Sequence, residues 1–222
     1  MSRNKLEKFA ENKTFSNFFE PDYDTVKGKD FPLKGIWNKV FFNNNNPLIL
    51  ELGCGRGEYT VGLAEKYPNM NFIGIDRKGA RMWKGCKTSV EKNMKNVAFI
   101  RSQIGHITYY FNKEEVSEIW LTFPDPQPKR SKVNKRLTSP LFLDFYREIL
   151  KKNGFIHLKT DNELLFEYTL GIIDGLHYKI VEKKSDIHSL KQIDENLLIE
   201  TYYEKMWKEQ GHKIYYIKFQ LG

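Results

Sequence analysis

The sequence predicts a doubly wound α/β fold whose mostly parallel sheet carries an antiparallel edge. From Leu48 on, short apolar runs alternate with stretches of helical periodicity. Continuous apolar strands that alternate with helices are typical of a parallel sheet covered on both faces. After its last helical stretch the chain closes on a β-rich segment, residues 214–219, which favours an antiparallel strand at one edge of the sheet.

Each element is predicted from its local pattern. The runs expected to form strands are residues 48–52, 71–75, 97–101, 118–123, 154–159, 177–181 and 214–219. The stretches expected to form helices are 58–66, 77–93, 139–152, 162–174 and a stretch near 196–210. Four asparagines at 43–46, followed by Pro47, predict a loop. This loop separates an aromatic-rich N-terminal arm, residues 1–46, which we expect to pack on the core, from a main domain, residues 47–222.

Composition and charge favour a polyanionic partner. The 222 residues include 36 basic and 28 acidic side chains, which gives a net charge of +8. Two cysteines are too few for a disulfide framework or a metal quartet, so no metal is predicted. The polar N-terminus and the lack of an apolar run of about 18 residues predict neither signal peptide nor membrane span, hence a cytoplasmic protein. The sequence carries no signal for an obligate protein partner, and it agrees equally with a monomer and a homodimer.

A glycine-rich turn follows the first strand of the main domain, where residues 51–58 read Glu-Leu-Gly-Cys-Gly-Arg-Gly-Glu. Glycines there permit a tight turn and close approach of a ligand to the backbone. A dinucleotide-binding turn has glycine where this chain has Glu58, so a nicotinamide dehydrogenase is disfavoured. Asp76, at the tip of the next strand, is placed to accept hydrogen bonds from ribose hydroxyls. Gln103, after the third strand, is placed for a polar contact with adenine.

A single acid followed by a run of cations marks the segment 122–136. Asp125 lies between two prolines, which stiffen the turn that presents it. No further acid occurs before Asp144, and the eight residues from 129 to 136 hold five cations: Lys129, Arg130, Lys132, Lys135 and Arg136. A rigid turn that presents one acid beside a basic segment fits chemistry on a polyanion. The alternative is a solvated basic loop after a strand.

Together these motifs resemble the bacterial tRNA (guanine-N7)-methyltransferase family. The glycine turn resembles the first motif of S-adenosylmethionine-dependent methyltransferases. The more specific matches are Thr122-Phe123-Pro124-Asp125-Pro126-x-Pro128-Lys129 with Lys135-Arg136-Leu137, then Leu158-Lys159-Thr160-Asp161, and Thr201-x-Tyr203-Glu204 with Gly211 downstream. The resemblance extends from about Leu48 to the C-terminus. Gln103 and Gln127 depart from it, because the family usually has an acid and a tryptophan at these two positions.

The resemblance implies a class I, Rossmann-like methyltransferase that uses S-adenosylmethionine as cofactor. It implies methyl transfer to N7 of a guanosine in tRNA, the variable-loop guanosine at tRNA position 46. The residues implied to border the cofactor are Glu51, Gly53, Gly55, Asp76, Gln103 and Asp125. Those implied to hold the target nucleotide are Lys129, Asp161, Thr201, Tyr203 and Glu204. The cations expected to contact RNA phosphates are Arg130, Lys132, Lys135 and Arg136.

The chemistry of guanine N7 defines what the catalytic residue must do. N7 has an in-plane lone pair and carries no proton, so the transfer needs no base, and positioning and electrostatics dominate. The product base is cationic, and a nearby carboxylate stabilises that charge and can also accept from the guanine N1–H and amino group. We therefore expect Asp125 to orient the base and offset its charge, with Asp161 opposite. No covalent adduct is required, so we expect no catalytic role for Cys54 or Cys86.

Two other functions stay open on the sequence alone. One is a methyltransferase for a protein or small molecule, although amine-directed members of the superfamily usually carry an Asn/Asp-Pro-Pro-aromatic motif where this chain has Phe-Pro-Asp-Pro. The other is a non-catalytic RNA-binding module on the same fold, against which the intact glycine turn, Asp76 and Asp125 argue. Cofactor titration separates these classes, because a pure RNA binder should have no affinity for S-adenosylmethionine.

Overall fold

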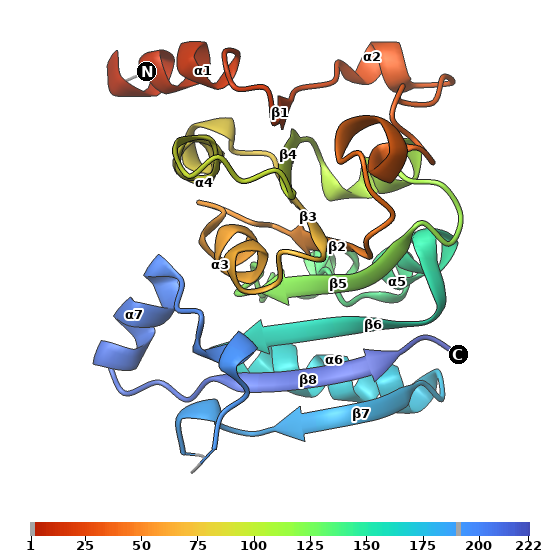
Figure 1. Ribbon diagram of the computed structural model, residues 1–222. Coiled ribbons are helices and arrows are strands. Elements are labelled where there is room, and N and C mark those ends of the chain that lie inside the picture. Colours follow the sequence, from red (N-terminus) through yellow and green to blue (C-terminus); the bar gives the residue numbers. More distant parts are fainter. Residues whose placement is uncertain (1–2, 190–191) are drawn as a thin grey trace. The chain divides into compact units, whose positions relative to one another are not determined.

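The structure, a computed structural model, describes residues 3–189 and 192–222. The chain forms two units that divide between Asn112 and Lys113. Both units combine a β-sheet with helices, as Figure 1 shows. In the described residues, no helix has the length and apolar character that crossing a membrane requires.

The first unit is built on parallel strands in the order β1-β4-β3-β2. Their bounds are Phe18–Phe19 (β1), Leu48–Leu52 (β2), Asn71–Asp76 (β3) and Val97–Arg101 (β4). In the sheet register Leu52 lies opposite Ile75, and Asp76 lies opposite Arg101. The carboxyl ends of β2, β3 and β4 therefore meet at one edge, where open α/β sheets bind their ligands.

Helices of the first unit cover this sheet and brace one another. They are α1 (Arg3–Asn12), α2 (Tyr23–Val26), the π-helical turn η1 (Trp37–Phe41), α3 (Glu58–Lys66), α4 (Gly79–Glu91) and the 3₁₀ helix η2 (Ile104–Tyr109). Figure 1 shows α1 beside α4. The side chain of Asn12 donates to the Gly79 carbonyl at 2.8 Å, and the Trp83 indole donates to the Glu11 carboxylate at 2.7 Å.

An aromatic cluster joins residues 3–46 to the rest of the first unit. Trp37 is fully buried at its centre, and its indole N–H donates to the Tyr110 carbonyl at 2.9 Å. Phe19 packs edge-on against this indole at 5.2 Å, and Phe31 and Phe111 stack at 5.7 and 6.0 Å. The described N-terminal residues thus belong to the first unit, which ends at Asn112.

The second unit has strands in the order β5-β6-β8-β7. Their bounds are Val116–Thr122 (β5), Leu150–Thr160 (β6), Lys179–Lys184 (β7) and Tyr215–Gln220 (β8). β6 pairs in parallel with β5, whereas β8 pairs antiparallel with both β6 and β7. The predicted combination of a mostly parallel sheet with an antiparallel edge is therefore confirmed.

Helices of the second unit are α5 (Pro140–Ile149), α6 (Glu163–Gly175), α7 (Tyr202–Glu209) and the 3₁₀ helices η3 (Arg130–Lys135), η4 (Ile187–Ser189) and η5 (Glu195–Leu198). Figure 1 shows α6 behind the strands of this unit. The stretch near 196–210 was predicted as one helical element and is instead divided into η5 and α7. The reason is Thr201, whose hydroxyl accepts from the Glu204 N–H at 3.1 Å and so begins a new helix.

Helix α4 lies close to the glycine turn at Gly85. A Cβ atom at this position would lie 2.8 Å from the Arg56 carbonyl oxygen and 2.8 Å from the Phe99 ring. One of these neighbours is backbone and the other is a ring in the core, so neither yields easily. Glycine at position 85 therefore permits the close approach of α4 to the turn.

We predict that Gly85→Ala destabilises the protein by about 1–3 kcal/mol, the usual cost of overpacking. The matched control is Gly171→Ala in α6, where an added Cβ meets nothing within 4 Å. That control should stabilise by about 0.5–1 kcal/mol, because alanine is the better helix former. Urea unfolding of both variants measures the difference, and equal stabilisation by the two would contradict the packing proposed for α4.

Candidate functional site

The glycine turn after β2 and the end of β3 form one hydrogen-bonded structure in the first unit. Gly53, Gly55 and Gly57 have φ values of 82°, 54° and 71°, a backbone region that favours glycine. The Gly53 N–H donates to the Ile75 carbonyl at 2.8 Å, and the Gly55 N–H donates to Asp76 Oδ2 at 3.0 Å. Three of the residues predicted to border a cofactor, namely Gly53, Gly55 and Asp76, are thus brought together.

The geometry around Asp76 fits the ribose of a nucleoside cofactor. Its second oxygen, Oδ1, accepts from the Lys78 N–H at 2.8 Å, so each carboxylate oxygen holds one backbone donor. A carboxylate offers about four acceptor positions, which leaves capacity for ribose hydroxyls. Next to it, a Cβ added at Gly55 would meet only the Gly53 carbonyl oxygen, at 4.0 Å. The turn therefore borders open space in which a ligand can approach the backbone.

Two other predicted cofactor residues occupy different surroundings. Glu51 is buried, and its Oε2 accepts from the Thr60 N–H at 2.8 Å and from the Thr60 hydroxyl. Thr60 lies in the first turn of α3, where backbone N–H groups have no partner within the helix. The Glu51 carboxylate accepts from one of these N–H groups, and its negative charge offsets the positive end of the helix dipole. Gln103 is exposed at the beginning of η2, where it makes no side-chain cap hydrogen bond.

Both cysteines are free thiols inside the first unit. Burial raises the pKa of Cys54 well above its usual value, and burial also raises the pKa of Cys86. The thiolate is the nucleophilic form of cysteine, so these thiols are poorly suited to attack a base. Their environment agrees with a reaction that uses no covalent enzyme–base adduct.

In the second unit, the Phe-Pro-Asp-Pro segment after β5 forms a tight, strained turn. Phe123 and Gln127 have φ values of 48° and 44°, which side chains other than glycine rarely adopt. Such a conformation costs about 1–3 kcal/mol per residue and persists where the surroundings enforce it. Asp125 lies between them, exposed, and its Oδ1 accepts from the Gln127 N–H at 3.0 Å. The turn therefore presents the Asp125 carboxylate at the surface of the unit.

Four of the five cations that follow this turn are exposed: Lys129, Arg130, Lys132 and Lys135. Arg136 is placed differently, with an exposed fraction of 5%. Its guanidinium donates to the carbonyls of Pro126 and Gln127 at 3.0 and 3.3 Å and lies 4.3 Å from the Tyr168 ring centroid. These donors stabilise the turn that presents Asp125, and the contact of Arg136 with RNA stays a prediction.

Asp161 follows the last residue of β6 and is half-buried. Burial raises the pKa of this carboxyl, while a backbone hydrogen bond and the electrostatic effect of His212 oppose the shift. A carboxyl whose pKa is raised by partial burial at the carboxyl end of a strand is a candidate functional group. The structure therefore gives Asp161 an environment that agrees with its predicted contact to the nucleotide.

The Thr201–Glu204 segment lies largely inside the second unit. Thr201 caps α7, and Glu204 is fully buried with its Oε2 accepting from Lys159 Nζ at 2.7 Å. Its other oxygen, Oε1, lies 3.6 Å from His188 Nε2. The described contacts of both residues are thus with protein groups. Tyr203 belongs to α7, but its side chain lies outside the described residues.

Lys159 is a residue that the sequence-based site assignment left out. The residues before and after it in β6 are buried, and its own side chain has an exposed fraction of 0%. A signal was present, because a lysine inside a continuous apolar run is rarely buried unless it has a partner. That partner, Glu204, is 45 residues away in the sequence, and no local pattern joins the two.

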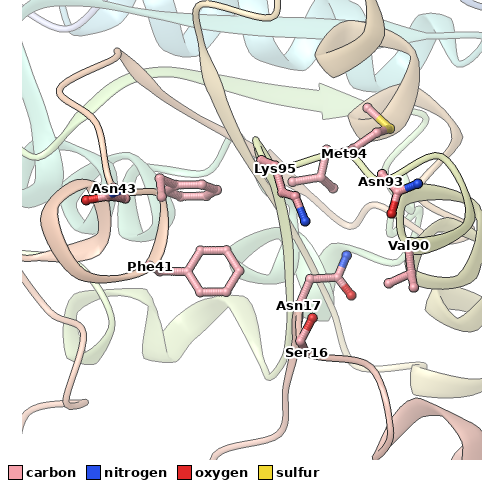
Figure 2. A pocket seen from close by; sticks show the side chains of 10 residues that line it. Ser16, Asn17, Phe41, Asn43, Val90, Asn93, Met94 and Lys95 are labelled. Atoms are coloured by element: carbon pink, nitrogen blue, oxygen red, sulfur yellow. The ribbon is translucent and has the colours of Figure 1, made fainter.

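Two cavities lie away from the predicted residues. Figure 2 shows the first, about 470 Å³, where the Phe41 ring and the side chains of Asn17 and Lys95 meet near the beginning of β4. The second, about 540 Å³, surrounds the beginning of β6 in the second unit, near Lys152 and Gly154. Both are at strand beginnings, whereas the predicted residues are at the carboxyl ends. Neither cavity therefore defines the candidate site.

Solved structures show which class of protein has this fold. The 16S rRNA methyltransferase KamB superposes with a TM-score of 0.63 over 83% of this chain and 92% of its own, at 12% identity. A structure described as an antibiotic related methyltransferase superposes with a TM-score of 0.59 over 82% and 90%, at 18% identity. The chain has the fold of class I, S-adenosylmethionine-dependent methyltransferases, as predicted.

Sequence comparisons narrow this class to a family. A family model described as "Putative methyltransferase" matches residues 45–217. The tRNA (guanine-N(7)-)-methyltransferase of Christiangramia forsetii is 48% identical over 99% of both chains, and that of Bacteroides fragilis is 50% identical over 100% of this chain and 87% of its own. The protein of the same name from Brevibacillus brevis is 34% identical over 89% and 91%. This chain belongs to the tRNA (guanine-N(7)-)-methyltransferase family, as its motifs predicted.

Proposed function

We propose that this chain transfers the methyl group of S-adenosylmethionine to N7 of a guanosine in tRNA, the variable-loop guanosine at position 46. Family membership along the whole chain is the observation that carries this proposal. The geometry of the two units supports it, since each presents carboxylates at the carboxyl ends of its strands. A tRNA substrate would place the enzyme in the cytoplasm.

The first unit supplies the groups suited to the cofactor, whose sulfonium provides the electrophilic methyl. The carboxylate of Asp76 retains capacity to accept from both ribose hydroxyls. Gly53 and Gly55 form the turn beside it, and the backbone at Gly55 permits close approach of a ligand. We propose that Glu51 borders the cofactor while it holds the start of α3. Gln103 is the proposed polar contact for adenine, and its exposure leaves its amide accessible.

The second unit supplies the groups suited to the base. Asp125 is exposed on a strained turn, which fits a carboxylate that orients guanine and stabilises the positive charge as it develops. Lys129 and Asp161 offer accessible polar groups for the nucleotide. Thr201, Tyr203 and Glu204 are the further residues proposed to hold the nucleotide, and the Thr201 cap fixes the start of the helix that carries the other two.

RNA binding must offset the free-energy cost of exposing the target base. N7 faces the deep major groove of an RNA helix, so the target must be tilted out of its stack at a cost of a few kcal/mol. Arg130, Lys132 and Lys135 are exposed on η3, with no acid between Asp125 and Asp144 to neutralise them. We propose that these three cations contact phosphates.

The central test is methylation of unmodified total tRNA with labelled cofactor, followed by mapping of the labelled base. We predict a label at N7 of guanosine 46. Label at any other base, or transfer to protein but not to RNA, would sink the proposal. Calorimetric titration with S-adenosylmethionine runs beside it, because a non-catalytic RNA binder should show no affinity for the cofactor.

We predict that Asp125→Asn lowers the single-turnover rate about 10²–10³-fold, the usual loss when one stabilising group of a transition state is removed. The loss should persist at every pH, because N7 carries no proton for a base to remove. Asp174→Asn, an exposed acid on α6, is the matched control and should keep the wild-type rate. Full recovery of Asp125→Asn at high pH would show that Asp125 acts as a general base instead.

We predict that the triple variant Arg130→Ala/Lys132→Ala/Lys135→Ala flattens the dependence of log Kd for tRNA on log salt by about 2, since each phosphate contact contributes 0.7–0.9 to the slope. The control triple Lys151→Ala/Lys152→Ala/Lys179→Ala removes the same charge from exposed positions at the opposite strand ends. It should change the slope little. If both triple variants flattened the salt dependence of log Kd equally, the effect would come from net charge alone and not from contacts of η3 with phosphates.

A further inference from the structure

Lys159 lies where the three predicted substrate segments of the second unit meet. It is the penultimate residue of β6, two residues before Asp161. In the parallel pairing of β5 with β6, Lys159 lies opposite Thr122, the last residue before the Phe-Pro-Asp-Pro turn. Its side chain reaches the segment before α7. Lys159 thus belongs to the segment that ends at Asp161 and forms hydrogen bonds with the other two segments.

The ammonium group of Lys159 ties the α7 segment to the sheet. Nζ donates to the Leu197 carbonyl at 2.8 Å, to the Ile199 carbonyl at 3.3 Å and to Glu204 Oε2 at 2.7 Å. These acceptors lie on both sides of Thr201, the cap of α7. An ammonium has three donors in all. One buried side chain therefore fixes both the backbone before the cap and the first turn after it.

The backbone of Lys159 holds the turn that presents Asp125. Its carbonyl accepts from the Phe123 N–H at 2.8 Å, and its Nζ lies 5.8 Å from the centroid of the Phe123 ring. Phe123 has the unfavourable φ of 48°. The hydrogen bond therefore helps to hold the backbone in a conformation that it would otherwise leave. Lys159 thus contacts the strained residue two positions before the catalytic carboxylate.

The electrostatics make this arrangement sensitive to the loss of either charge. Lys159 and Glu204 are both fully buried. Burial lowers the pKa of Lys159 and raises the pKa of Glu204, and the attraction between the two charges opposes both shifts. Removing one partner of a buried pair leaves an uncompensated charge, whereas neutralising both costs far less. Single and double variants of the pair can therefore distinguish its effect on the stability of the protein from its effect on the geometry of the site.

We propose that Lys159 is a positioning residue, which acts through the Thr201–Glu204 segment and the Phe123 backbone to hold the nucleotide-binding side of the site. The proposal rests on the proposed function for its kinetic part, but its structural part is independent of activity. It assigns Lys159 no contact with cofactor or base. The functional effect of the Lys159 side chain comes from the three acceptors that its ammonium holds, and the main-chain carbonyl adds the hydrogen bond from the Phe123 N–H.

The test uses Lys159→Met, Glu204→Gln and the double variant Lys159→Met/Glu204→Gln in the full-length protein. Lys152→Met, an exposed lysine in the same strand, is the matched control. Lys159→Met should lower kcat about 100-fold, the loss expected from misplacement by about 1 Å. Its KM for tRNA should change less, because the exposed cations of η3 are untouched. Its affinity for S-adenosylmethionine, measured by calorimetry, should stay within about twofold of the wild type.

The double variant separates positioning from stability. It should recover most of the thermal stability that Lys159→Met loses, because no buried charge is left unpaired. It should not recover kcat, and its loss should be no greater than that of the worse single variant, since the two residues act as a unit. Recovery of kcat together with stability would show a merely structural lysine. If the loss of kcat in the double variant equalled the product of the two single losses, Glu204 would act on the nucleotide independently of Lys159. Recovery of kcat or a multiplied loss of kcat would each overturn the proposal.

Hydrogen exchange of the unliganded protein provides a readout that needs no activity. Amides of residues 197–204 should exchange about tenfold faster or more in Lys159→Met than in Lys152→Met, because the charge-assisted hydrogen bonds to this segment are lost. Unchanged exchange would overturn the positioning proposal while methylation by the wild type still stands. A wild type that fails to methylate tRNA would instead overturn the proposed function and leave the exchange result intact.

Discussion

Parallel strand pairing in register is the constraint on which the candidate site depends. In the first unit it sets Leu52 opposite Ile75, so the glycine turn and Asp76 meet at one edge. In the second unit it sets Thr122 opposite Lys159, so the segments that carry Asp125 and Asp161 leave the sheet at neighbouring positions. A shift of one residue would turn every side chain of a strand to the other face. The placement of the acids thus follows from backbone hydrogen bonds rather than from the acids themselves.

The basic side chains of the second unit occur in two environments, the surface and the interior, and have a different effect in each. The cations of η3 face solvent, where attraction to a polyanion acts over a Debye length of about 10 Å and is weakened by salt. Arg136 and Lys159 are buried and directed at protein acceptors, where charge-assisted hydrogen bonds fix geometry. The same type of side chain therefore serves two purposes in this chain, and burial decides which one applies.

Much of the fold could be predicted because its signals are local. Apolar runs of the right length became β2, β3 and β4, and helical periodicity gave α3 and α6 nearly to the residue. The segment near 196–210 was less well predicted, since the capping hydrogen bond at Thr201 interrupts a stretch that has continuous helical periodicity. The helix expected to run to residue 152 ends at Ile149, because Leu150 pairs with Val116 in the sheet.

The sequence by itself determined the class of chemistry. The glycines after β2, the acid at the end of β3 and the Phe-Pro-Asp-Pro turn indicate the family by residue type and spacing alone. Tertiary structure alone decided which charges are available. Arg136 and Lys135 are neighbours in sequence, yet one is buried against Tyr168 and the other faces solvent. Burial and pairing arise from contacts between distant segments, such as Lys159 with Glu204, and a linear pattern does not record those contacts.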